Sequence, residues 1–199
     1  MALTPSTMLP LGTRAPDFSL PSTDGETVSL DGQRGERGTV VMFICNHCPY
    51  VIHIADALAG TARDYMARGI GFVAINSNDT EAFPADNLEN MVREKASRGY
   101  PFPYLLDPSQ EVARAYDAAC TPDIYLFDGD LELVYRGQFD DSRPNRISSG
   151  NYDSSDSRPT GGDLKAAMDS LLSGEPVAGD QKPSMGCNIK WKPGNEPGA

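Results

Sequence analysis

An apolar run that ends in two closely spaced cysteines constrains this chain more than any other feature of its sequence. Residues 39–44 read Thr-Val-Val-Met-Phe-Ile, which predicts a short, fully buried strand. The motif Cys-Asn-His-Cys-Pro follows at residues 45–49, and apolar residues then recur at helical spacing over 50–67. The sequence therefore predicts a strand that turns into a helix at a pair of thiols. A helix N-terminus favours the thiolate, which is the form of cysteine that attacks disulfides or binds metal.

Strands and helices alternate along most of the remaining chain. The expected strands cover 15–20, 27–30, 39–44, 70–75, 102–106, 123–127 and 131–136, and the expected helices cover 50–67, 86–97, 107–118 and about 164–172. The first two strands and the last two each form a hairpin, and Asp86 is expected to cap the second helix. This order predicts an α/β fold with a central mixed sheet, helices on both of its faces and an N-terminal β-hairpin.

Two segments fall outside the alternating pattern. Residues 140–162 are rich in Asp, Ser, Gly, Pro and Arg, which predicts a long loop. The C-terminal end is rich in proline and glycine but holds Cys187, Ile189 and the only tryptophan, Trp191. We therefore expect one domain over 1–175, which includes the long loop, and an irregular tail over 176–199 that packs partly on it.

Composition limits the possible partners and location. The net charge is −11, from 17 basic and 28 acidic side chains, which is the wrong sign for a generic nucleic-acid binder. No apolar run is long enough to span a membrane, and the first residues lack the features of a signal peptide, so we expect a cytoplasmic protein without a membrane partner. Four cysteines are too few for a disulfide scaffold, so the close pair is expected to be catalytic or metal-binding.

Further motifs complete a resemblance to a known superfamily. They are Ala-Pro-Asp-Phe at 15–18, Cys-Asn-His-Cys-Pro-Tyr-Val at 45–51, Thr-Pro-Asp at 121–123, Phe-Asp-Gly-Asp at 127–130 and Gly-Cys-Asn-Ile-Lys-Trp-Lys at 186–192. Over about residues 12–175 the chain resembles the thioredoxin superfamily, and within it the peroxiredoxin-like, or redoxin, branch of the alkyl hydroperoxide reductase/thiol-specific antioxidant group. The resemblance implies a thioredoxin-like fold and thiol redox chemistry without a cofactor.

The same resemblance gives Pro122 a role. It implies a cis-proline that faces the active-site thiols, presents backbone to an extended substrate and keeps metal away from the cysteines. A trans peptide bond that simply enters a strand is the alternative, since cis bonds are only about 5–6% of X-Pro bonds in folded proteins.

Spacing leaves the identity of the nucleophile open. In thioredoxins the attacking cysteine lies about six residues beyond the middle of the preceding strand, and this count reaches Cys48 from Met42. Pro49 supports this assignment, because proline is favoured in the first turn of a helix. We therefore favour Cys48 as the thiolate, while the usual assignment would make Cys45 the attacker. His47 lies between the thiols and would stabilise a thiolate, unless it is an exposed side chain without a role.

Three further residues carry weaker expectations. His53 is expected to be a surface or packing residue. Cys120 lies two residues before the expected cis-proline, and is either a small buried side chain or a neighbour of the site. Cys187 is a third redox thiol if the tail folds back.

The leading functional hypothesis is a thiol–disulfide oxidoreductase acting through Cys45 and Cys48. Its substrate is a protein or small-molecule disulfide, and a separate thiol reductant restores the pair. One alternative is a thiol peroxidase with antioxidant activity, although neither cysteine follows the peroxiredoxin pattern Pro-x-x-x-Thr/Ser-x-x-Cys. Another is a copper- or zinc-binding protein that uses Cys45, His47 and Cys48. The last alternative is a binding module that uses the loop at 140–162 as its interaction surface. The sequence specifies neither the substrate, the direction of electron flow nor the oligomeric state.

Overall fold

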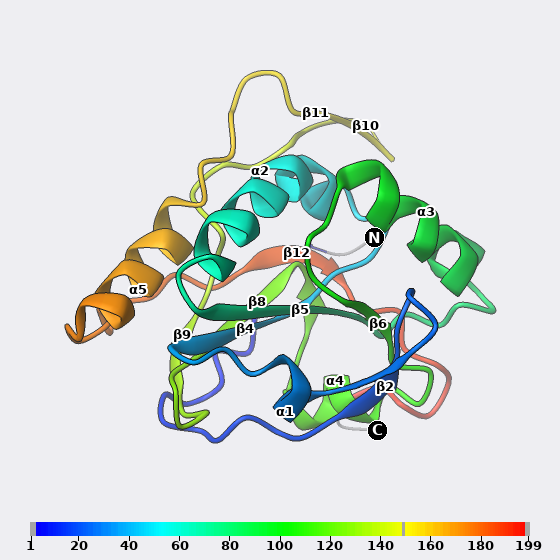
Figure 1. Ribbon diagram of the computed structural model, residues 1–199. Coiled ribbons are helices and arrows are strands. Elements are labelled where there is room, and N and C mark those ends of the chain that lie inside the picture. Colours follow the sequence, from blue (N-terminus) through cyan, green and yellow to red (C-terminus); the bar gives the residue numbers. More distant parts are fainter. Residues whose placement is uncertain (1–2, 149, 198–199) are drawn as a thin grey trace.

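A five-stranded mixed sheet forms the centre of the computed structural model, which describes residues 3–148 and 150–197 (Figure 1). The strands lie in the order β6-β5-β4-β8-β9. Their bounds are β4 Gly38–Phe43, β5 Ile70–Asn76, β6 Tyr104–Leu106, β8 Asp123–Phe127 and β9 Leu133–Arg136. β4 runs parallel to β5 and antiparallel to β8, so the sheet is mixed, as expected.

Helices cover both faces of this sheet. Strand β4 is fully buried, and its alternate side chains face two separate apolar clusters: Val40 and Met42 face one, and Val41 and Phe43 face the other. The first cluster is covered by α2 (Pro49–Met66), α3 (Leu88–Arg98) and α5 (Gly162–Ser173). The second is covered by α1 (Leu30–Gln33), α4 (Glu111–Ala115) and the hairpin of β2 (Ser19–Pro21) and β3 (Thr27–Ser29) (Figure 1). Burial of both faces explains why the run at 39–44 is almost wholly apolar.

Two helix starts differ from the expectation. The helix expected from residue 107 begins only at Glu111, because the Asp107 carboxylate folds inward to accept hydrogen bonds from Ser77 Oγ and the Ala113 backbone. Asp86 does not cap α3. Asn87 is the N-cap and accepts from the Asn90 backbone at 2.9 Å, while Asp86 ends the short 3-10 helix η1 (Pro84–Asp86).

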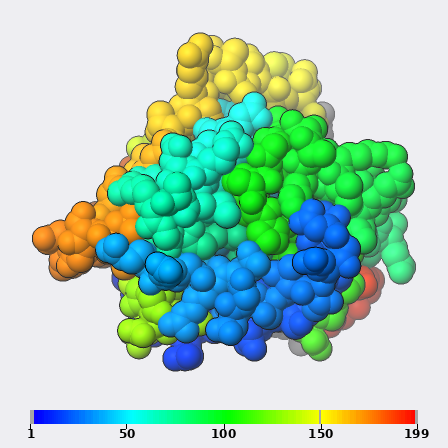
Figure 2. Space-filling model, viewed as in Figure 1, coloured from blue at the N-terminus to red at the C-terminus, as the bar shows by residue number. Residues whose placement is uncertain are grey.

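The expected long loop at 140–162 contains a hairpin that the sequence did not predict. β10 (Asn145–Ser148) pairs with β11 (Asn151–Asp153); β10 is exposed throughout, and β11 is exposed to half-buried. Figure 2 shows this segment in yellow as a ridge above α2. Tyr152 contacts Tyr50 of α2 edge to face, with ring centroids 6.0 Å apart. The hairpin buries little of its surface, so it lacks the alternation of apolar and polar residues that marks a strand in a sequence.

The tail that was expected to be irregular also contains a strand. β12 (Met185–Asn188) lies between β1 (Leu3–Pro5) and β7 (Cys120–Thr121) in a three-stranded sheet. The expected packing of the tail is confirmed, since Cys187 and Ile189 are buried. The division of the chain into a domain over 1–175 and a tail over 176–199 stays a prediction. None of the helices in the described part of the chain combines the length and apolar character that a membrane span requires.

Candidate active site

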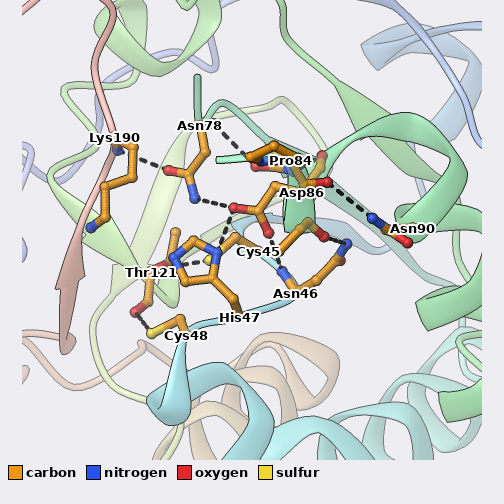
Figure 3. Close-up of polar contacts among 12 residues, drawn as sticks. Cys45, Asn46, His47, Cys48, Asn78, Pro84, Asp86, Asn90, Thr121 and Lys190 are labelled. Atoms are coloured by element: carbon orange, nitrogen blue, oxygen red, sulfur yellow. Dashed lines mark hydrogen bonds and ion pairs between the residues drawn. The ribbon is translucent and has the colours of Figure 1, made fainter. Parts of the chain in front are cut away.

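Cys48 occupies the N-cap of α2, where the count from the preceding strand placed it. Its backbone is extended, with φ −73° and ψ 121°, and Pro49 is the first residue of the helix. A proline suits this position because its missing N–H has no partner in the first turn. The Cys48 side chain is fully buried, and its Sγ lies 3.0 Å from the carbonyl oxygen of Thr121 (Figure 3).

The surroundings of the two cysteines shift their pKa values in opposite directions. Burial alone would raise the pKa of Cys48, but hydrogen bonds from the Cys187 and Cys45 thiols, from Thr121 and from the Cys187 backbone lower it well below its usual range. The hydrogen bond with Cys48, followed by burial and the charge of Asp86, raises the pKa of Cys45 well above its usual range. The helix N-terminus adds to the stabilisation of a Cys48 thiolate.

The peptide bond between Thr121 and Pro122 is cis, which confirms the isomer expected from the resemblance. Thr121 lies between the two thiols, with its Oγ1 3.5 Å from Cys45 Sγ and its carbonyl oxygen 3.0 Å from Cys48 Sγ. Sequence reasoning named Thr121 only as the residue before the proline. Its contact with both sulfurs depends on the antiparallel pairing of β4 with β8, which brings the end of one strand beside the start of the other.

His47 forms an ion pair with a buried carboxylate. Its Nδ1 lies 2.7 Å from Oδ2 of Asp86, whose side chain is fully buried, while the imidazole is 23% exposed. The hydrogen bond with Asp86 raises the pKa of His47 and outweighs the opposing effect of burial. The imidazole also stacks on Phe83, with centroids 5.9 Å apart and planes 7° from parallel. His47 is therefore held in place next to the start of α2, rather than free in solvent.

Asp86 is the functional candidate that sequence reasoning missed, because its position suggested a helix cap. Its Oδ1 accepts from the Asn46 backbone and its Oδ2 from the Asn78 side chain, both at 2.8 Å (Figure 3). The Asn78 amide oxygen in turn accepts from the Lys190 backbone at 2.8 Å. This chain of hydrogen bonds connects the C-terminal tail to His47. No local sequence signal predicts it, since the partners come from separate segments.

The structure brings Cys187 to the Cys45–Cys48 pair, whereas the side chains of Cys120 and His53 contact other residues. Cys187 pairs with Thr121 in the sheet, and its thiol and backbone lower the pKa of Cys48. The Cys120 thiol donates to the Pro122 carbonyl at 3.5 Å, and burial raises its pKa well above the usual range. His53 is buried with its Nε2 3.0 Å from Ser142 Oγ, and burial lowers its pKa, so it is a packing residue as expected.

The donor atoms at the site only partly match a metal centre. Among the residues that the structure describes, Cys45, His47 and Asp86 have ligand atoms within 4.8 Å of one another. This set of ligands differs from the one expected from the sequence, in which Cys48 accompanied Cys45 and His47 in place of Asp86. Both carboxylate oxygens of Asp86 already accept hydrogen bonds, and three protein ligands are fewer than the four of a closed zinc site. Metal binding stays a prediction.

A mixed sheet, a thiol at the start of the helix that follows β4, and a cis-proline opposite it define a thioredoxin-like protein. The sequence model of the AhpC/TSA family matches residues 11–136, and the chain belongs to this family. Membership places it among the peroxiredoxin-like thiol oxidoreductases.

Similar proteins are found among sequences and solved structures. A Mycobacterium tuberculosis protein named as a candidate peroxiredoxin is 31% identical over 116 residues, which are 58% of this chain and 69% of that protein. The thiol-disulfide oxidoreductase ResA of Bacillus subtilis is 25% identical over 123 residues, which are 62% of this chain and 64% of that protein. A crystal structure of an uncharacterised conserved protein from Geobacillus kaustophilus has 54% identity and a TM-score of 0.90, and covers 97% of this chain and 98% of that one.

Proposed function

We propose that this protein is a thiol–disulfide oxidoreductase in which Cys48 attacks and Cys45 resolves. The observation that carries this proposal is the placement of the two thiols, with Cys48 at the N-cap of α2 and both sulfurs beside Thr121. The pKa shifts agree with it, since the pKa is lowered at Cys48 and raised at Cys45. Thiol–disulfide exchange needs one thiolate that attacks at neutral pH and one neighbouring thiol that attacks the mixed disulfide afterwards. The similarity to ResA, which is named a thiol-disulfide oxidoreductase, supports the same reaction type.

The reaction begins with attack of the Cys48 thiolate on a protein or small-molecule disulfide R–S–S–R′. A bond forms between Cys48 Sγ and RS, and R′S⁻ leaves. Cys45 then loses its proton and attacks Cys48 Sγ, which forms the Cys45–Cys48 disulfide and releases RS⁻, which takes up the proton. The two cysteines supply the two electrons that reduce the substrate, and a separate thiol reductant restores them.

His47 acts as a positioning and electrostatic residue in this scheme. Asp86 holds its ring and raises its pKa, so the imidazolium persists to a higher pH than that of an ordinary histidine. A positive charge next to the start of α2 adds to the preference for a Cys48 thiolate. The Thr121 side chain lowers the pKa of both thiols.

The test compares single cysteine variants in reaction with oxidised glutathione, followed by peptide mapping. We expect the wild-type protein to form the Cys45–Cys48 disulfide, and Cys48→Ser to lose disulfide reduction. Cys45→Ser should still react at Cys48, with a rate that persists below pH 7 because the pKa of that thiol is lowered. Cys120→Ser is the matched control and should behave as wild type. Undiminished disulfide reduction by Cys48→Ser would contradict the proposal.

A thiol peroxidase is the second candidate function. The 31% identity to the M. tuberculosis candidate peroxiredoxin favours it. The spacing around both cysteines argues against it, because the hydroxyl residue of the peroxiredoxin pattern is replaced by Cys45 or Met42. Stopped-flow measurement of hydrogen peroxide consumption separates the two activities. A rate no faster than that of free cysteine would exclude the peroxidase.

A further inference from the structure

Strand β12 occupies the backbone edge at which the thioredoxin resemblance places an extended substrate. It pairs antiparallel with β7, which runs directly into the cis-proline. Cys187 lies opposite Thr121 in this pairing, and Asn188 lies opposite Cys120. The C-terminal segment thus lies in the orientation of an extended peptide whose cysteine faces the active-site thiols.

Close approach between β12 and β7 is possible because the residue before Cys187 is a glycine. A Cβ atom at Gly186 would lie 1.9 Å from the Thr121 carbonyl oxygen, which no side chain can occupy. The backbone of β12 therefore passes directly over the residue that contacts both Cys45 and Cys48. Gly186 lets the strand fit next to the cis-proline, and Cys187, the next residue, directs its thiol towards the start of α2.

The Cys187 thiol meets Cys48 in the interior of the protein. Cys48 and Cys187 belong to the same buried cluster, and the thiol and backbone of Cys187 both lower the pKa of Cys48. The exposed fractions of Cys45, Cys48 and Cys187 are 2%, 0% and 3%, and all three belong to one buried cluster. Cys48 interacts with each of the other two, since it is the largest cause of the raised pKa of Cys45 and of Cys187.

We propose that Cys187 is an intramolecular exchange partner of Cys48, presented by β12 along Thr121 in the way that an extended substrate strand would be presented. The proposal rests on the thiol–disulfide exchange proposed above. It gives Cys48 a choice of two partners, Cys45 on the loop before the helix and Cys187 on the tail.

The exchange step balances within the protein and the substrate. Cys48 carries the mixed disulfide Cys48–S–S–R after its attack on R–S–S–R′. The Cys187 thiol gives up its proton and attacks Cys48 Sγ, so that a Cys48–Cys187 bond forms and the bond to RS breaks. The leaving RS⁻ takes up the proton. Cys48 and Cys187 are oxidised by two electrons, and the substrate disulfide is reduced.

The same contact with Cys48 keeps the Cys187 thiol protonated, and therefore unreactive, in the reduced protein. In the reduced protein its hydrogen bond to Cys48, followed by burial, raises the pKa of Cys187 well above the usual range. Once Cys48 is in a mixed disulfide, its sulfur no longer carries the charge that holds this proton. The main cause of the raised pKa is then removed at the step at which Cys187 must attack.

The test uses Cys45→Ser, which removes the competing partner. The full-length variant is treated with oxidised glutathione, alkylated and digested with trypsin, which releases Cys48 in peptide 38–63, Cys187 in 166–190 and Cys120 in 115–136. We expect a disulfide between peptides 38–63 and 166–190. In Cys45→Ser/Cys187→Ser the glutathione should stay on Cys48 with a lifetime at least about tenfold longer, since an oriented internal thiol is far more effective than one in solution.

Cys45→Ser/Cys120→Ser is the matched control and should keep the link to peptide 166–190. The proposal is overturned if Cys45→Ser accumulates glutathione on Cys48 while Cys187 remains free and is alkylated. This outcome leaves the proposed function standing, because Cys48 has still attacked a disulfide. If the wild-type protein forms neither the Cys45–Cys48 disulfide nor a mixed disulfide at Cys48, the proposed function fails together with the inference.

Discussion

At the scale of single residues, the neighbours of a cysteine rather than its residue type decide the direction in which its pKa shifts. Cys45 and Cys48 are three positions apart and both buried, yet only Cys48 lies at a helix N-terminus, and only its pKa is lowered. Asp86 acts on both sides of this difference, since its charge raises the pKa of Cys45 and its hydrogen bond raises that of His47. One buried carboxylate therefore helps to separate the roles of the two thiols.

Asp86→Asn should lower the pKa of His47 towards its ordinary value, because the hydrogen bond with Asp86 is the main cause of the rise. The imidazolium that stabilises the Cys48 thiolate would then be lost at a lower pH than in the wild-type protein. NMR titration of the imidazole protons measures both histidines at once. His53 serves as the internal control, since its shift comes from burial and from Asp140 and Arg143. An unchanged His47 titration would contradict the role given to Asp86.

At the scale of secondary structure, the short sheet of β1, β12 and β7 determines the surroundings of the thiols. It joins the N-terminal segment, the C-terminal tail and the residues before the cis-proline. The register of β12 with β7 brings Cys187 to Thr121, and Gly186 is the residue that permits their approach. A displacement of this one strand would remove hydrogen bonds from Cys48 without any change in α2.

Gly186→Ala should lower the free energy of unfolding by about 1–3 kcal/mol, as overpacking does in other tightly packed sites. The added Cβ would meet the Thr121 carbonyl oxygen at 1.9 Å, so β12 must move away from β7. Gly179→Ala is the matched control, because no atom lies within 4 Å of a Cβ at that position. Denaturant unfolding of both variants measures the difference. Equal stability of Gly186→Ala and Gly179→Ala would show that β12 is not held against Thr121.

At the scale of the whole molecule, a buried acid connects the small sheet to the central one. Asp123 begins β8 and is fully buried, and its Oδ2 accepts from the Ala119 backbone at 3.1 Å. Burial raises the pKa of Asp123 to about 6. The pKa is therefore higher in the folded chain than the ordinary value of about 3.9. Its contribution to stability is complete below pH 4 and is lost as the pH rises through 6.

Asp123→Asn should remove this part of the pH dependence. Between pH 4 and pH 8 the wild-type protein should lose up to about 3 kcal/mol through Asp123, from a shift of about two pKa units at 1.36 kcal/mol each. Asparagine does not titrate, so the stability of the variant relative to wild type should increase over the same range. Urea unfolding at several pH values measures this difference. A difference that stays constant with pH would contradict the raised pKa.

Local patterns in the sequence are sufficient to predict the central sheet, helix α2 and the position of Cys48 at the start of that helix. These features depend on near neighbours, namely a run of apolar residues, helical spacing and a proline in the first turn. The cis bond at Pro122 was also anticipated, through the thioredoxin-like resemblance. The hairpin at β10 and β11 was not, because its exposed strands carry no alternating pattern.

By itself, the sequence thus determined the α/β class and the pair of thiols at the end of a buried strand. Only the tertiary structure decided which charges and hydrogen bonds surround them. Asp86, Thr121 and Cys187 reach Cys45 and Cys48 from segments far away in the chain, through strand pairing and a buried carboxylate. A thiol pKa depends on such contacts rather than on sequence neighbours, so the preference for a Cys48 thiolate follows from the folded structure.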